Sequence, residues 1–181
     1  MLDFELIVCY TIYTIKQREV TTMENVKMIC FDMDGTIADL YSVDNWLDKL
    51  REFDPAPYIE AKPLWNMSEL AKVLMLLAKQ GIEIRIITWV SMETTPDYTA
   101  EVRTAKMEWL KKYDFPFAHF HGVQYGTTKA NCVRKYLAEN ETAILIDDNA
   151  KVRNGWHLGE TIDPTAENIV EILKNLLTDE E

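Results

Sequence analysis

The sequence predicts an α/β protein built around one mainly parallel sheet, with helices on both of its faces. Short apolar runs alternate with stretches of helical spacing from about residue 26 onward. Acidic or hydroxyl side chains directly follow several of these apolar runs. A chain of 181 residues is long enough for one domain with its own core. We therefore expect a three-layer, Rossmann-like domain whose functional groups gather beyond the carboxyl ends of the strands.

Apolar runs bounded by turn residues indicate the strands, and apolar positions three and four residues apart indicate the helices. Strands are expected at 26–31, 82–88, 118–124 and 142–146. Helices are expected at 43–53, at 67–80, from Thr95-Pro96-Asp97 to about Tyr113, from about Thr128 to Ala138, and after Asp163-Pro164.

The helix expected at 67–80 has a strong amphipathic pattern. Its apolar side chains lie on one face and come from Met67, Leu70, Val73, Leu74 and Leu77. Gly81 follows, and glycine commonly ends a helix because it adopts the left-handed conformation without strain. We expect this helix to belong to the core of the domain and to end at Gly81.

The compact domain is expected to span residues 23–178. Residues 1–22 contain a strand-like alternation, and we interpret them as an N-terminal extension, with an added hairpin strand as the alternative. Residues 40–65 lie between the first acidic motif and the helix at 67–80. We expect them to form a small cap insertion.

The composition excludes several classes of function. The net charge of −11 at pH 7 opposes binding to nucleic acid and to anionic membranes, unless basic residues form a local patch. No apolar run approaches the roughly 18–20 residues of a membrane span, and the apolar stretch near the start lacks the basic flank of a signal peptide. Three cysteines without close pairing favour a reducing compartment. We expect a soluble cytoplasmic protein.

Residues suited to chemistry stand at the ends of the expected strands and helices. Asp32-Met33-Asp34-Gly35-Thr36 follows the first strand, Thr88 ends the second, Lys129 starts a later helix, and Asp147-Asp148 follows the strand at 142–146. A carboxylate such as Asp32 can attack phosphorus and form an aspartyl-phosphate. Asp34 can protonate the leaving oxygen and later deprotonate water. Carboxylates converging on a phosphate need a cation, and hard oxygen ligands suit Mg²⁺.

This order of motifs resembles the haloacid dehalogenase (HAD) superfamily of phosphohydrolases, over residues 26 to about 149. The resemblance implies a Rossmann-like sheet of the HAD type and a Mg²⁺-dependent phosphatase in which Asp32, Asp34, Thr88 and Lys129 are catalytic. Thr88 would offer its hydroxyl to the phosphoryl oxygens, and Lys129 would offset charge. By the family pattern, Asp32 and Asp147 are metal ligands, Asp34 adds its backbone carbonyl, and Asp148 binds directly or through water.

The resemblance also bears on the substrate. Asp34 favours phosphate-ester hydrolysis, because dehalogenation needs no acid–base aspartate. The first motif and the Leu145-Ile146-Asp147-Asp148 ending are similar to those of 5′(3′)-deoxyribonucleotidases, which implies a nucleotide or another small phosphorylated metabolite. The expected cap is smaller than theirs, and the sequence Trp89-Val90-Ser91 after Thr88 differs. Candidate substrate contacts are the aromatic residues Tyr41, Trp46, Tyr58, Trp65 and Trp89.

Each motif also has a purely structural interpretation. The first motif contains favoured turn residues, Asp147-Asp148-Asn149 could cap a helix, and Thr88 and Lys129 could be an ordinary strand end and a solvated side chain. The occurrence of all four motifs in order favours function. His119, His121 and His157 lack metal-ligand spacing and are expected to be packing or loop residues.

Two other functions stay open as alternatives. A phosphatase acting on nucleic-acid ends would need one basic face made of Lys106, Lys111, Lys112, Lys129, Arg134 and Lys135. A non-catalytic phosphate-binding regulatory module of the same fold would be expected to lack the nucleophile, the acid or the lysine. The sequence retains all three.

Overall fold

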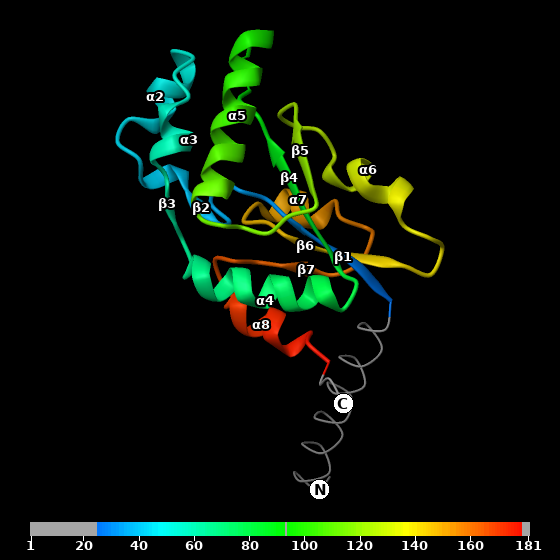
Figure 1. Ribbon diagram of the computed structural model, residues 1–181. Coiled ribbons are helices and arrows are strands. Elements are labelled where there is room, and N and C mark those ends of the chain that lie inside the picture. Colours follow the sequence, from blue (N-terminus) through cyan, green and yellow to red (C-terminus); the bar gives the residue numbers. More distant parts are fainter. Residues whose placement is uncertain (1–24, 93, 179–181) are drawn as a thin grey trace, which may run out of the picture.

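The computed structural model describes residues 25–92 and 94–178, and its centre is a five-stranded parallel sheet (Figure 1). The strands are β1 (Val26–Phe31), β4 (Glu83–Trp89), β5 (His119–Val123), β6 (Thr142–Ile146) and β7 (Thr161–Ile162), in the spatial order β5-β4-β1-β6-β7. The chain extends the sheet from β1 through β4 to β5 and then returns to the other side of β1 with β6. The strand order therefore reverses between β1 and β6, and α/β proteins commonly bind ligands at such a point.

Two apolar cores cover the two faces of the sheet. Ile29 and Phe31 of β1 pack into one core with α4 (Met67–Lys79), α5 (Pro96–Lys112) and α8 (Ile169–Asn175). Met28 and Cys30 pack into the other core with α6 (Lys129–Val133) and α7 (Ala150–Asn154). One strand supplies both cores because successive side chains point to opposite faces. The predicted three-layer, Rossmann-like fold class is confirmed.

The two long helices begin and end at the residues that the sequence indicates. The side chain of Asn66 caps α4 by accepting a hydrogen bond from the N–H of Glu69, and Gly81 follows its end with a φ of +89°. The hydroxyl of Thr95 caps α5 by accepting from the N–H of Tyr98, and Pro96 takes the first helical position. Within the described ranges, no helix combines the length and the apolar character needed to cross a membrane.

A helical insertion interrupts the chain between β1 and α4. It contains η1 (Leu40–Ser42), α2 (Trp46–Arg51) and α3 (Ala56–Glu60), enclosed by a short antiparallel pair of β2 (Ala38–Asp39) and β3 (Lys62–Pro63). Helix α3 packs against α5, and Figure 1 shows α2 and α3 beside the N-terminal half of α5. The insertion overlaps the segment 40–65, whose role as a cap stays a prediction.

The structure corrects two of the predicted helices. The helix expected from about Thr128 to Ala138 is shorter, because α6 ends at Val133 and a 3₁₀ turn, η2 (Arg134–Tyr136), follows it. The last helix does not start directly after Asp163-Pro164. It begins at Ile169, and the side chain of Asn168 caps it by accepting hydrogen bonds from the N–H groups of residues 170 and 171. The extension expected at residues 1–22 lies outside the described residues.

Candidate active site

The loop after β1 turns back sharply and carries both acidic residues of the first motif. The carbonyl oxygen of Met33 accepts hydrogen bonds from the N–H groups of residues 36–38, at 2.9 to 3.2 Å. Gly35 has a φ of +75°, in the left-handed region that a residue with a Cβ adopts at a cost. The N–H of Asp32 still pairs with β6, where it donates to the carbonyl of Ile146 at 2.9 Å. Asp32 therefore lies at the boundary between sheet and loop.

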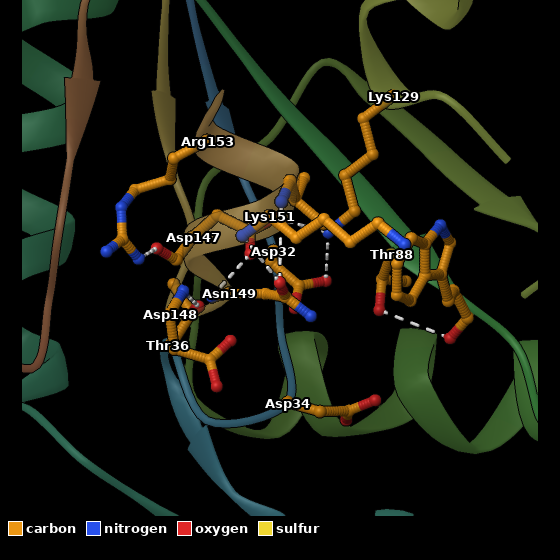
Figure 2. Close-up of polar contacts among 12 residues, drawn as sticks. Asp32, Asp34, Thr36, Thr88, Lys129, Asp147, Asp148, Asn149, Lys151 and Arg153 are labelled. Atoms are coloured by element: carbon orange, nitrogen blue, oxygen red, sulfur yellow. Dashed lines mark hydrogen bonds and ion pairs between the residues drawn. The ribbon is translucent and has the colours of Figure 1, made fainter. Parts of the chain in front are cut away.

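Lys129 bridges Asp32 and Asp147 at the carboxyl ends of the neighbouring strands β1 and β6 (Figure 2). Its Nζ lies 2.8 Å from Oδ1 of Asp32 and 2.7 Å from Oδ2 of Asp147. Burial by itself would lower the pKa of Lys129, but the charges of Asp32 and Asp147 outweigh it and raise the pKa above its ordinary value. Lys129 is therefore charged at neutral pH.

The loop after β6 is held by hydrogen bonds on several sides. The other oxygen of Asp147, Oδ1, accepts from the N–H of Asn149 at 2.9 Å, and its backbone carbonyl accepts from the guanidinium of Arg153 at 2.7 Å. The N–H of Asp148 donates to the hydroxyl of Thr36 at 3.1 Å, which ties this loop to the one after β1. Asn149, rather than either aspartate, caps α7. The helix-capping interpretation thus applies to Asn149, while one oxygen of Asp147 closes the turn before the helix.

Three carboxylates converge where the two loops meet. One side-chain oxygen each from Asp32, Asp147 and Asp148 lies within 4.8 Å of the others. Burial, followed by the charges of Asp32 and Asp147, raises the pKa of Asp148 to about 7. The raised pKa means that a further negative charge at this point is unfavourable unless a cation balances it. A cluster of hard oxygen donors with this property fits a Mg²⁺ ion. Asp32 and Asp147 are the residues for which the resemblance implies side-chain ligation of a metal, and Asp148 is the one for which it implies binding directly or through water.

Asp34 lies apart from this cluster and has its own cationic partner. Oδ2 of Asp34 is 2.5 Å from Nζ of Lys106, and the same ammonium donates to Oγ1 of Thr88 at 2.8 Å. Burial raises the pKa of Asp34, and the neighbouring Lys106 opposes that rise. The site therefore holds four carboxylates and two ammonium groups, an excess of two negative charges when all four acids are ionised. A divalent cation would balance that excess.

A pocket of about 380 Å³ opens over these groups. Asp32, Asp34, Lys129, Asp147 and Asp148 line its polar end. Most of the remaining lining is apolar or aromatic and comes from the helical insertion, from the end of β4 and from the loops after β4 and β5, including Tyr41, Trp46, Tyr58, Trp89 and Tyr125. A volume of this size accommodates a phosphate together with a small organic group.

The structure places most of the expected substrate-contact residues at the pocket, with two differences. Trp65 does not line it; its indole N–H donates to the carbonyl of Thr36 at 2.8 Å and supports the loop. Thr88 is fully buried and does not line the pocket either, so its hydroxyl is linked to the site through Lys106. His119, His121 and His157 also lie outside the lining.

Lys106 is the residue of the site that the sequence interpretation missed. A phosphatase acting on nucleic-acid ends would need Lys106 and five other basic residues to form one face, but Lys106 and Lys129 are 0% and 3% exposed, so these six residues do not form a basic face. A signal was present in the sequence. Lys106 occupies a position of the apolar stripe of α5, four residues after Val102, and lysine is almost never fully buried without a partner.

Comparison with known proteins shows a likeness in fold. No protein-family model and no curated protein matches this chain. A chain of the Pnkp1/Rnl/Hen1 RNA repair complex superposes with a TM-score of 0.51 at 16% identity, over 77% of this chain and 42% of that one. A second structure of the Pnkp1/Rnl/Hen1 complex gives a TM-score of 0.50 at 16% identity, over 76% and 46%. This chain thus spans less than half the length of either matched chain.

A candidate HAD-like phosphatase from Mesorhizobium loti is also similar, with a TM-score of 0.49 at 14% identity, over 87% of this chain and 90% of that one. At identities this low, the likeness to solved structures describes the fold. The chemistry of the site has to be argued from its own residues.

Proposed function

We propose that this protein is a Mg²⁺-dependent phosphomonoester hydrolase of the HAD type, working through an aspartyl-phosphate. The observation that carries the proposal is the bridge that Lys129 makes between Asp32 and Asp147 at the point where the strand order reverses. A buried cation between two carboxylates is suited to receive a phosphate dianion, because the same cation offsets the charge of the nucleophile and of the transferring group.

In the first step, a carboxylate oxygen of Asp32 attacks phosphorus and forms an O–P bond, while the bond from phosphorus to the leaving oxygen breaks. Asp34 gives its proton to that oxygen, so the leaving group departs as an alcohol. In the second step, a water molecule attacks phosphorus and transfers a proton to Asp34. The bond to Asp32 then breaks, and inorganic phosphate is released with the enzyme restored.

The side chains of Asp32, Asp147 and Asp148, together with the backbone carbonyl of Asp34, would hold the Mg²⁺ ion. When bound, the ion neutralises charge on the carboxylates and on the phosphoryl oxygens. Lys129 keeps Asp32 and Asp147 in place through its two ion pairs. Thr88 does not line the pocket, and its hydroxyl accepts a hydrogen bond from Lys106. Its proposed role is therefore to hold Lys106 in place.

The proposed substrate is a small phosphorylated metabolite or a nucleotide. Support comes from the pocket, whose polar end is formed by the carboxylates and whose walls are apolar and aromatic, with the ring centroids of Tyr41 and Trp46 5.2 Å apart in an edge-to-face contact. Aromatic walls favour a planar or apolar leaving group over a strongly charged one.

The test is phosphate release from 4-nitrophenyl phosphate, measured with Mg²⁺ and with excess chelator, followed by a panel of nucleotides, sugar phosphates and 5′-phosphorylated oligonucleotides. We expect activity that depends on Mg²⁺ and that falls at least about a thousandfold in Asp32→Asn. Asp44→Asn, at an exposed position, is the matched control and should behave as wild type. Full activity of Asp32→Asn, or full activity in chelator, would contradict the mechanism.

A further inference from the structure

Lys106 is buried more completely than a lysine on a helix normally is. It is 0% exposed, and it shares the inner face of α5 with Tyr98, Val102, Ala105, Trp109 and Leu110, all of them buried. Moving an ammonium group from water into such surroundings is costly unless it is paired. The contacts that Lys106 makes should therefore explain why it occupies this position.

Three groups from three other parts of the chain surround the ammonium of Lys106. Oδ2 of Asp34 lies 2.5 Å away, Oγ1 of Thr88 lies 2.8 Å away, and the ring centroid of Tyr58 lies 4.7 Å away. These residues belong to the loop after β1, to β4 and to α3 of the helical insertion. The neutral hydroxyl and the aromatic face hold the ammonium in one place, which leaves Asp34 as its charged partner among the described residues.

The second cation of the site does not duplicate this contact. Lys129 is paired with Asp32 and Asp147, and Lys106 is paired with Asp34. Lys129 thus contacts the proposed nucleophile and a proposed metal ligand, whereas Lys106 contacts the proposed acid–base group. An acid–base group has to be aimed at the leaving oxygen within hydrogen-bond reach, so its orientation affects the rate.

We propose that Lys106 is a positioning residue for Asp34, which it orients toward the leaving group. This inference rests on the proposed phosphatase function and adds to it a residue that acts through Asp34 without touching the substrate. If the pair were only structural, its loss would lower the stability of the fold, and any change in rate would be the same for every leaving group. A positioning residue for a general acid affects only those reactions in which the leaving oxygen needs a proton.

The test compares the release of two leaving groups in single turnovers with enzyme in excess, which isolates the first step. 4-Nitrophenolate leaves without a proton, whereas the alcohol of an alkyl phosphate such as glycerol phosphate needs one. For Lys106→Met, we expect the release of 4-nitrophenolate to stay within about threefold of wild type and the release of glycerol to fall about a hundredfold. Lys111→Met, at an exposed position of the same helix, is the matched control and should change neither rate.

A second comparison uses Asp34→Asn and the double variant Asp34→Asn/Lys106→Met. If Lys106 acts through Asp34, both release glycerol at the same reduced rate, because the double variant has no further group to misplace. This comparison can still contradict the inference if Lys106→Met does not fold, since removing both members of the pair leaves no unpaired buried charge.

Three results would overturn the inference: an equal loss for both leaving groups in Lys106→Met, no loss for glycerol phosphate, or a double variant clearly slower than Asp34→Asn. In each of them wild type still releases 4-nitrophenolate, and the proposed phosphatase function stands. A wild-type protein that releases neither leaving group would instead refute the proposed function, and the inference with it.

Discussion

Lys129 and Lys106 approach the site from opposite faces of the sheet. Lys129 starts α6, which packs with Met28 and Cys30, whereas Lys106 lies on α5, which packs with Ile84 and Ile86. Alternation along the strands explains their partners. Asp32 continues the series of Met28 and Cys30 and pairs with Lys129, and Thr88 continues the series of Ile84 and Ile86 and accepts from Lys106. Two cations therefore reach one acidic site without meeting each other.

Replacement of Lys129 by methionine should leave Asp32 and Asp147 buried beside each other without their cation. We expect kcat to fall by about 10²–10³ because the transferring phosphoryl group loses its charge partner. Measured by urea unfolding in chelator, the free energy of unfolding should fall by about 3–5 kcal/mol. Lys72→Met, at an exposed position of α4, is the control and should change neither quantity by much. A Lys129→Met protein with wild-type kcat would remove Lys129 from the mechanism.

Replacement of Gly35 by alanine should damage the site in addition to straining the backbone. A Cβ at this position would lie 2.5 Å from Oδ2 of Asp148 and 2.6 Å from the ring of Tyr41. We expect weaker Mg²⁺ binding and lower activity, together with about 1–2 kcal/mol of lost stability from the left-handed backbone. Gly81 has a similar φ of +89° and nothing within 4 Å, so Gly81→Ala should lose comparable stability while keeping its activity. Equal activities of the two variants would contradict the predicted clash.

The stability of the metal-free protein should depend on pH through Asp148. Its pKa of about 7 in the folded protein lies above the value of about 3.9 in an unfolded chain. The folded state therefore binds this proton more tightly, and the stabilisation is fully present below about pH 4 and is lost as the pH rises through about 7. In chelator, the melting temperature of wild type should fall relative to Asp148→Asn between pH 5 and pH 8.

The same melting temperatures, measured with Mg²⁺ in place of the chelator, test whether Asp148 binds the ion. Because the ion and the proton compete for the same carboxylate, Mg²⁺ should raise the melting temperature of wild type more at pH 8 than at pH 5. Asp148→Asn should lose most of this response. A constant difference between the two proteins at all pH values, or a full Mg²⁺ response in Asp148→Asn, would show that Asp148 is not the titrating ligand.

Replacement of Trp46 by alanine should weaken the binding of aromatic substrates. Trp46 lines the pocket and packs edge to face against Tyr41 at 5.2 Å. Loss of an aromatic contact is worth about 0.5–1.5 kcal/mol, which corresponds to roughly a 2- to 12-fold increase in KM. We expect this increase for 4-nitrophenyl phosphate with kcat unchanged, and a smaller one for glycerol phosphate, which has no ring. A uniform change for both substrates would argue against contact between Trp46 and the ring.

Much of the molecule could be predicted from local patterns. Strand β1, strand β6 and the ends of α4 and α5 follow from apolar periodicity and from Asn66, Thr95 and Gly81, because each signal acts over a few neighbouring residues. The short elements β2, β3, α3, α7 and β7 were not predicted. Two-residue strands carry no periodicity, and they form because segments distant in the sequence come together.

The sequence by itself determined the fold class and the order of Asp32, Asp34, Thr88, Lys129 and Asp147-Asp148 along the chain, because βα alternation brings the ends of parallel strands to one edge of the sheet. Only the tertiary structure decided which cation meets which carboxylate. In the sequence, Lys106 is one of several lysines of a helix. In the folded protein, the packing of α5 leaves it 0% exposed and places its Nζ 2.5 Å from Oδ2 of Asp34. The pairing joins residues 72 positions apart, and no local pattern encodes a contact of that range.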